Sequence, residues 1–454
     1  MLNYTPKKIL NREAAMINPA KTCQPVGAMY AALGVHECLP HSHGSQGCCA
    51  FHRMFLTRHF KDPAMASSSS FTEGASVFGG GGNLKTAVRN IFDLYDPAII
   101  AVHTTCLSET IGDDLISLIT DIKIPEGKYV VHCNTPSYSG SHITGFSNMI
   151  SGFIKYLSKR TGSSNGEICL LPGFVNPGDM REYKRIMELM RVDYTMLPDS
   201  SGVMDAPMTG KYQMYPKGGT KIQDIIQLGD CRKTIALGSF ASEAPAEVLK
   251  KKCKVDYSVQ PLPIGIEATD RFIMELRELS QKEVPYPLEE ERGQLVDIML
   301  DTHPYTYNKK VAIYGDPDTV LGAAAFVLEL GMIPKYMVTG TPGSRFEAEA
   351  NALLEKYGVE NCFAKAEGDL FLMHQWIKNE PVDLLLGGTH GKHIARAEDI
   401  PLVRIGFPII DRYVHSYMPI VGYKGAMRMI EMIVNALLDY QDSHCEEKDM
   451  EMVL

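Results

Sequence analysis

Three cysteines in loop-like surroundings are the residues of this chain best suited to metal or redox chemistry. Cys23 comes directly before Gln24-Pro25, Cys48 ends the turn-rich segment 43–48, and Cys106 follows a β-like apolar run. Each lies in a loop or at the end of a regular element, where a thiolate can point toward a bound group. Glycine beside such a cysteine also lets the backbone approach that group closely.

The spacing of these cysteines limits the kind of site that they can form. The chain has no Cys-x-x-Cys motif, so neither a zinc knuckle nor a ferredoxin-like cluster is predicted. An iron–sulfur site would need a fourth ligand of another type, or a second chain. The alternative is that the cysteines only pack, since a free cysteine usually behaves as a small buried hydrophobe. The remaining cysteines lie in no matching motif and are interpreted as structural: Cys38, Cys49, Cys133, Cys169, Cys231, Cys253, Cys362 and Cys445.

Three other motif-like segments do not predict a ligand site. The glycine run 79–82 precedes a predicted helix and could bind an anion, but it lacks the Lys-Ser/Thr ending of a phosphate loop. Gly391-Lys392 has the lysine without the other positions, so no nucleotide site is predicted. His41 and His43 could form a metal pair. Because they lie in a Pro/Gly-rich turn beside Cys48, a hydrogen-bonding role is favoured.

The elements that must position these residues alternate short apolar strands with longer helices. Residues 98–102 and 129–132 are predicted to be buried strands, and residues 83–95 an amphipathic helix opened by the glycine run. The same alternation continues through the rest of the chain. It is typical of parallel sheets covered by helices on both faces.

This pattern predicts an α/β fold with three doubly wound, Rossmann-like domains and mainly parallel sheets, as the length of 454 residues allows. Composition breaks suggest the boundaries. They give an amino-terminal arm (1–20), a first α/β domain (21–163), a second (164–292), the end of a connecting helix (293–307), a third α/β domain (308–435) and a carboxy-terminal tail (436–454). All three candidate cysteines fall in the first domain.

Composition excludes several classes of protein. A net charge of −9 argues against nucleic-acid binding and leaves no basic patch for membranes. No apolar run approaches the roughly 18 residues of a membrane span, and the first residues lack the apolar core of a signal peptide. Eleven cysteines without a secretory signal indicate a reducing compartment. The sequence therefore predicts a cytoplasmic protein with no disulfide framework.

Several longer segments resemble the β chains of nitrogenase molybdenum–iron proteins. The similarity covers nearly the whole chain, and the short amino-terminal arm resembles the clostridial type. The segments that carry it are INPAKTCQPVGA, HGSQGC, SSSSFTEGASVFGGGGNLKTAV, TTCLSETIGDDL, NTPSYSGSHITGF, GDPD at 315–318, IGFPIIDR at 405–412 and GYKGAM at 422–427.

The resemblance implies that this chain holds part of a P-cluster, an 8Fe-7S centre shared with an α chain. The β chains of the family supply three cysteines and one serine. The matching positions are Cys23, Cys48, Cys106 and Ser137, with Cys48 in the bridging place. The residues alone would suggest only a turn serine after proline at Ser137. A serine oxygen is a harder ligand than a thiolate and suits more oxidised iron.

The implied function is electron relay in nitrogenase, an oxidoreductase. In this family the β chain joins an α chain in an α2β2 heterotetramer, and the Fe protein docks transiently with ATP bound. Electrons pass to the molybdenum–iron cofactor, which only the α chain holds, where dinitrogen becomes ammonia. Phe78 matches the docking phenylalanine of the family. The alternative for Phe78 is a place in the core.

A second metal site is implied between two copies of the chain. Asp297 and Asp301 are four residues apart and share one helix face, which by itself predicts only a solvated acidic surface. The β chains of the family bind a mononuclear cation there, completed by an acidic residue of the other copy. Asp62 and the backbone carbonyl of Lys61 match those contacts. Oxygen ligands favour calcium, magnesium or ferrous iron.

Three alternatives stay open. One is the β chain of a vanadium or iron-only nitrogenase, although the wording of segments 41–53 and 67–80 resembles the molybdenum type. Another is a cofactor-assembly scaffold of the same superfamily, which should lack part of the cysteine and serine set. The last is a non-metal α/β binding protein in which the cysteines are buried packing residues.

Overall fold

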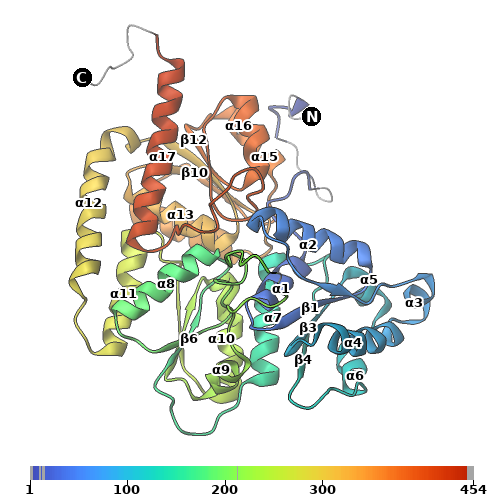
Figure 1. The fold of residues 1–454 in the computed structure, drawn as a ribbon. Helices are drawn as coiled ribbons and strands as arrows, with labels where there is room; N and C mark the ends of the chain where they lie inside the picture. Colours follow the sequence, from blue (N-terminus) through green and yellow to red (C-terminus); the bar gives the residue numbers. More distant parts are fainter. Residues whose placement is uncertain (1–3, 10–11, 13–15, 212, 447–454) are drawn as a thin grey trace.

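Three parallel sheets, each built from one consecutive part of the chain, form the framework of the protein (Figure 1). The computed structural model describes residues 4–9, 12, 16–211 and 213–446. Every strand pair within the three sheets is parallel, and helices flank each sheet. The predicted α/β fold with mainly parallel sheets is therefore confirmed.

The first sheet has the strand order β2-β1-β3-β4. Its strands are β1 (Cys38–His43), β2 (Ser67–Ser68), β3 (Ile99–Thr104) and β4 (Tyr129–Cys133). Its helices are α1 (Gln24–Leu33), α2 (Gln46–Phe60), α3 (Glu73–Phe78), α4 (Gly81–Tyr95), α5 (Cys106–Ile111), α6 (Leu115–Thr120) and α7 (His142–Leu157).

The second sheet has the order β6-β5-β7-β8. Its strands are β5 (Ile168–Leu171), β6 (Tyr194–Met196), β7 (Lys233–Leu237) and β8 (Tyr257–Gln260). The accompanying helices are α8 (Pro177–Leu189), α9 (Ile222–Gln227), α10 (Ser239–Cys253) and α11 (Ile266–Ser280).

The third sheet has the order β11-β10-β9-β12-β13. Its strands are β9 (Lys310–Gly315), β10 (Ile333–Thr339), β11 (Phe363–Lys365), β12 (Leu384–Gly387) and β13 (Leu402–Arg404). Its helices are α13 (Pro317–Glu329), α14 (Arg345–Tyr357), α15 (Leu370–Asn379) and α16 (Lys392–Glu398). Two long helices, α12 (Tyr286–Thr306) and α17 (Gly422–His444), run side by side along one edge of the molecule (Figure 1).

In the described residues, both ends of the chain are more ordered than the predicted arm and tail. The described part of the arm packs on α15, where Gln375 Nε2 donates to the carbonyls of Pro6 and Lys8 at 3.2 and 2.6 Å. Helix α17 continues to His444, so residues 436–444 are helical, while residues 447–454 of the predicted tail lie outside the described residues. The domain boundaries themselves stay a prediction. Among the described helices, none is both long and apolar enough to cross a membrane.

The turn predicted around His41 and His43 is wrong, because these residues belong to β1. This strand is buried along its whole length and pairs with both β2 and β3. Its polar side chains find partners inside the protein instead of in water. The alternation of apolar and polar residues that marks a half-buried strand is therefore missing, and Pro40 adds a further turn signal.

An aromatic cluster lies where the three sheets meet. Tyr30 of α1 lies 5.1 Å from Phe60 and 5.3 Å from Phe174 between ring centroids. Phe174 follows β5, and it lies 5.4 Å from Phe407, which follows β13. Helix α1 is buried along its whole length. It therefore connects the first sheet to segments of the other two.

Candidate metal centre

The four predicted cluster ligands belong to different elements and lie close together. Cys23 is the N-cap residue of α1, Cys48 lies in the first turn of α2, Cys106 opens α5, and Ser137 lies in the loop after β4. Ser137 hydrogen-bonds with the Cys23 thiol, and Cys106 acts electrostatically on both Cys23 and Cys48. All four are half-buried. The first sheet and its helices thus present three thiols and one hydroxyl together near the protein surface.

The thiols are poised to bind a cation. Burial raises the pKa of the Cys23 and Cys48 thiols, and the neighbouring Cys106 raises them further. Without a cation the thiols of Cys23 and Cys48 stay protonated at neutral pH, because burial disfavours their thiolate forms. Iron would displace these protons as it binds. The helix amino termini at Cys23 and Cys48 also favour negative charge.

Close backbone packing sets the position of Cys23. Helices α1 and α7 touch at two glycines: a Cβ added to Gly27 would lie 1.7 Å from the His142 carbonyl oxygen, and one added to Gly145 would lie 1.9 Å from that of Gln24. The Gln24 side chain then donates to the carbonyls of Pro136 and Ser139, at 3.0 and 2.9 Å. These carbonyls flank Ser137, so one side chain ties the start of α1 to the serine loop.

A second set of bonds ties the serine loop to Cys106. Thr135 donates its N–H to Thr104 Oγ1 and its hydroxyl to the Thr104 carbonyl, both at 2.6 Å. Thr104 ends β3, two residues before Cys106. The four ligand positions are therefore held by contacts between strand ends and helix starts, which is where ligands gather in parallel α/β sheets.

The third sheet also reaches this place. The Thr22 N–H donates to His142 Nδ1 at 3.2 Å, and His142 Nε2–H donates to Asp316 Oδ1 at 2.6 Å. Asp316 follows β9, and both His142 and Asp316 are almost fully buried. The residue before Cys23 is thus fixed through one histidine to the third sheet.

The donor set suits iron–sulfur ligation more than a single ion. Among the described residues, no three His, Cys, Asp or Glu side chains converge closely enough to hold one metal ion. Three spread thiols and a hydroxyl fit a larger cluster whose other ligands come from a second chain.

The family model for nitrogenase component 1 type oxidoreductases matches residues 23–438. This chain belongs to that family. It is 61% identical to the nitrogenase molybdenum–iron protein β chain of Clostridium pasteurianum, with all of both chains covered. It is 43% identical to the corresponding β chain of a Nostoc strain, over 96% of this chain and 86% of the relative.

Solved structures agree with this assignment. A chain of the structure titled "Nitrogenase Cp1 at pH 6.5" superimposes with a TM-score of 0.99 at 60% identity, with both chains fully covered. A chain of "Nitrogenase Cp1 at pH 5" has a TM-score of 0.68 at 17% identity, over 97% of this chain and 93% of that one, which shows a shared fold alone. The predicted resemblance and the function as a nitrogenase subunit are confirmed, and these relatives do not favour the open alternatives.

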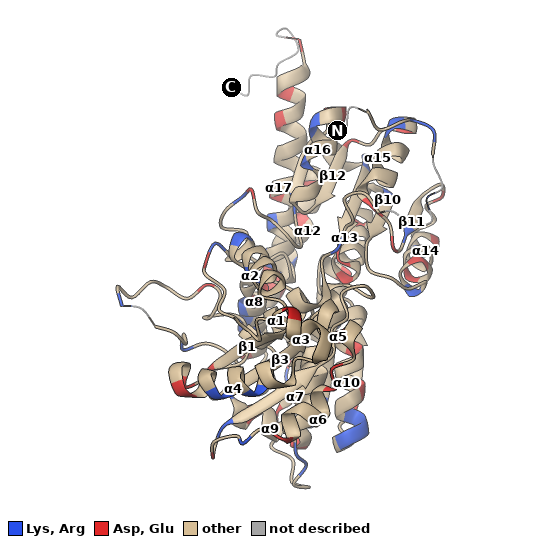
Figure 2. Cartoon of the chain, turned by 90° about the vertical axis from the view of Figure 1, so that its right-hand side faces the viewer, with Lys and Arg blue, Asp and Glu red and all other residues tan. Residues whose placement is uncertain are grey.

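Phe78 is not a core residue, so that alternative is wrong. It ends α3 and is 91% exposed, and the preceding Val77 is 73% exposed. Helix α3 lies beside α5 at the outer edge of the first sheet (Figure 1, Figure 2), and Glu73 in its first turn is the one charged residue of α3. An exposed aromatic residue beside a second apolar side chain is typical of the centre of a protein interface.

The residues of the predicted interface cation are separate within one chain. Asp297 and Asp301 are exposed on α12, while Asp62 is half-buried just after α2. Burial and the nearby Asp205 raise the pKa of Asp62. Lys61, in the left-handed conformation that ends α2, donates its ammonium to the Ile410 carbonyl at 3.0 Å. The three carboxylates would need two copies of the chain to meet.

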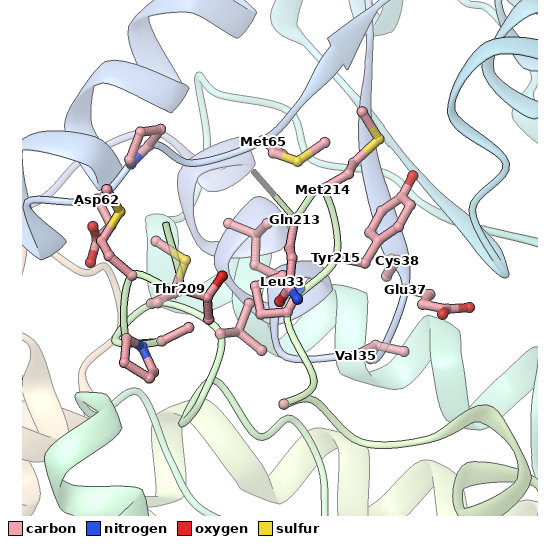
Figure 3. Close-up of a pocket in the computed structure, with 18 of the residues that line it drawn as sticks. Leu33, Val35, Glu37, Cys38, Asp62, Met65, Thr209, Gln213, Met214 and Tyr215 are labelled. Carbon is pink, nitrogen blue, oxygen red and sulfur yellow. The ribbon is translucent and has the colours of Figure 1, made fainter. Parts of the chain in front are cut away.

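A methionine-rich pocket of about 370 Å³ lies apart from the four candidate ligands (Figure 3). It is lined by residues around Leu33 and Cys38 and by the segment 203–218, and it opens to solvent. Asp62 and Glu37 lie on opposite sides of it in Figure 3. Its lining is mainly apolar and includes Met65, Met204, Met208 and Met214.

Several residues that build the site were not found from the sequence. Gln24, Gly145, Thr135 and His142 position the ligands without being ligands. The glycine run does sit at a helix start, but the Gly80 N–H donates to the Asp113 carboxylate, so an internal anion already occupies this end of α4. A glycine spaced for helix contact is the one signal that could have pointed to Gly145.

Proposed function

We propose that this chain relays electrons in a nitrogenase molybdenum–iron protein through an 8Fe-7S P-cluster shared with an α chain. The convergence of Cys23, Cys48, Cys106 and Ser137 carries this proposal. The assembly would be an α2β2 heterotetramer, served by the Fe protein with ATP bound. Electrons would leave for the molybdenum–iron cofactor of the α chain, where dinitrogen is reduced to ammonia.

In this proposal the chain binds iron, orients the ligands and shields the sulfurs from water. The thiolates of Cys23, Cys48 and Cys106 would hold iron, and the partly buried surroundings of Cys23 and Cys48 would keep water from the sulfurs. A bound cluster of this kind gains and releases single electrons. Ser137 keeps its proton while it hydrogen-bonds to Cys23, and would lose that proton if its oxygen became an iron ligand.

Iron analysis tests the proposal directly. The chain is produced anaerobically with the α subunit of the same organism, purified as the complex, and analysed for iron and molybdenum. If the proposal is right, the complex contains more iron than the α-chain cofactor alone can account for. The additional cluster should also give its own redox signal. A colourless, iron-free complex would contradict it and would favour purely structural cysteines.

Ser137→Ala is expected to have a milder effect than loss of a cysteine, mainly in the oxidised state. Reversible ligation by a serine oxygen couples the loss of an electron from the cluster to the loss of the serine proton. The reduction potential of the cluster should therefore fall by about 59 mV for each unit by which the pH rises, for one electron and one proton. Ser137→Ala should keep its iron in the reduced state and lose this pH dependence. Redox titrations between pH 6 and pH 9 measure it, with Ser139→Ala in the same loop as the control. Equal slopes in all three proteins would remove Ser137 as a ligand.

We also propose a mononuclear calcium, magnesium or iron ion between two β chains, held by Asp297 and Asp301 of one copy and by Asp62 and the Lys61 carbonyl of the other. Carboxylates brought together without a cation would repel one another, so the ion would also join the two copies. Anomalous scattering from crystals of the assembled tetramer would show the ion. If Asp297 and Asp301 lie in solvent far from Asp62 of the other copy, the site does not exist.

A further inference from the structure

A hydrogen-bonded path leads inward from the exposed Phe78 loop. It begins at Gly80, whose N–H donates to both carboxylate oxygens of Asp113, at 3.2 and 3.0 Å. Gly80 follows the end of α3 by two residues. A Cβ added to Gly80 would lie 2.0 Å from Phe71 Cζ and 2.9 Å from Asp113 Oδ2. The backbone of the loop therefore rests directly on Asp113.

A buried histidine holds the other side of Asp113. His43 Nε2 lies 2.9 Å from Asp113 Oδ2, and His43 Nδ1 lies 2.9 Å from the Ser69 hydroxyl. The carboxylate can only accept, so Nε2 carries the proton and Nδ1 accepts from Ser69. Ser69 Oγ also lies 2.8 Å from Nε2 of His41. The His43 side chain is fully buried and that of Asp113 is 9% exposed, which strengthens these bonds.

The backbone of His43 continues the path toward Cys106. The His43 carbonyl accepts from the Thr105 N–H at 3.1 Å and from the Ser108 hydroxyl at 2.7 Å. Thr105 is the N-cap residue of α5, directly before Cys106. The Asp113 N–H donates to the Ser108 carbonyl at 3.1 Å. Both ends of α5 are thus tied to His43, and its length sets Cys106 roughly 10 Å from Asp113.

The same strand end also leads to Cys48. After His43 the chain turns through Gly44, whose φ of +152° brings it against Thr105: an added Cβ would lie 1.9 Å from Thr105 Oγ1. Ser45 then caps α2 by accepting from the Gly47 N–H, and Cys48 lies in the first turn of that helix. The two ligand-bearing helix starts therefore meet at the end of β1.

We propose that Asp113 and His43 are positioning residues that hold the Phe78 loop in a fixed relation to the ligands Cys48 and Cys106. This inference rests on the proposed electron relay and on Fe-protein docking at Phe78. Neither residue is one of the four candidate ligands. Docking that moves the loop must move Asp113, and through His43 it must move the starts of both ligand-bearing helices. The pair thereby couples partner binding at the surface to the geometry of electron transfer.

The test compares Asp113→Ala with Asp114→Ala in the complete α2β2 protein. Asp114 caps α6 by accepting from the Ile116 N–H at 3.1 Å. Asp114→Ala is therefore a matched control: it also replaces an aspartate by alanine, at the neighbouring position, but leaves the hydrogen bonds of Asp113 and His43 in place. Stopped-flow oxidation of reduced Fe protein, the half-saturating Fe-protein concentration, ATP hydrolysed per electron, and iron content are measured for each. Loss of a charge-assisted hydrogen bond should slow electron transfer about tenfold in Asp113→Ala.

The half-saturating concentration of Fe protein should change by less than about twofold, since Phe78 remains exposed, and more ATP should be hydrolysed per electron. A merely structural role would leave that ratio unchanged. If Asp113→Ala does not fold, His43→Gln breaks the same path and carries the same expectation. Electron-transfer rates equal to those of Asp114→Ala, or loss of iron alone, would overturn the inference. If Phe78→Arg also has no effect on electron transfer, the docking proposal itself fails. If Phe78→Arg impairs electron transfer and Asp113→Ala does not, only the positioning role of Asp113 and His43 is wrong.

Discussion

A Cys106→Ala protein is expected to lose most of the iron of the proposed shared cluster and to fall by more than about 100-fold in dinitrogen reduction, since even residues that only support a metal ligand contribute 10- to 100-fold. Alanine removes the thiolate and offers no replacement. Cys106 also opens α5, so its loss leaves iron uncoordinated at the point where the ligand-bearing helix starts meet. Cys23→Ala and Cys48→Ala should behave alike.

Iron content and activity of the anaerobically purified complex measure this effect. Cys445→Ala provides the matched control, because Cys445 lies just after α17 and has no proposed role. It should keep both iron and activity. A Cys106→Ala protein with its full iron content and full activity would contradict the ligand assignment.

A Phe78→Arg protein is expected to keep its iron and lose electron delivery from the Fe protein. Aromatic residues at the centre of an interface often contribute 2 kcal/mol or more, which corresponds to roughly 30-fold in affinity. The change introduces a charge at a residue that is 91% exposed, so folding should be unaffected. The half-saturating Fe-protein concentration should rise by about that factor.

Leu94→Arg is the control for this prediction. Leu94 is 73% exposed on α4 of the same domain, and it has no proposed role in docking. Titration of each variant with Fe protein, followed by the rate of product formation, gives both the half-saturating concentration and the maximal rate. If the two arginine variants match the unaltered protein, the docking surface lies elsewhere.

Regular elements could be predicted where local pattern and burial agree. The strand at 98–102 and the helix at 83–95 appear as β3 (Ile99–Thr104) and α4 (Gly81–Tyr95). Strand β1 could not, because its histidines and serines are satisfied by partners on other segments. A polar strand with internal partners carries no hydrophobic period.

Some residues of the candidate site could likewise be predicted from the sequence, and others could not. The three cysteines could be singled out from residue type and surroundings, whereas Ser137 was reached only through family resemblance, since a serine after proline indicates a turn. Asp113 and Gln24 carry no local signal at all. Their roles depend on contacts with residues far away in the sequence, which only the folded arrangement brings together.

The burial of α1 has a consequence for the order of events during synthesis. The helix that begins at Cys23 packs on α7 and, through Tyr30, meets Phe174 in a cluster that continues to Phe407, while the residue before Cys23 is fixed through His142 to Asp316. These contacts join segments far apart in the chain, and closing such long loops carries an entropy cost that slows folding. The contacts that hold Cys23 are complete only when the segments that carry Asp316 and Phe407 are present and packed. We therefore expect iron to bind at Cys23 only once this later part of the chain is in place.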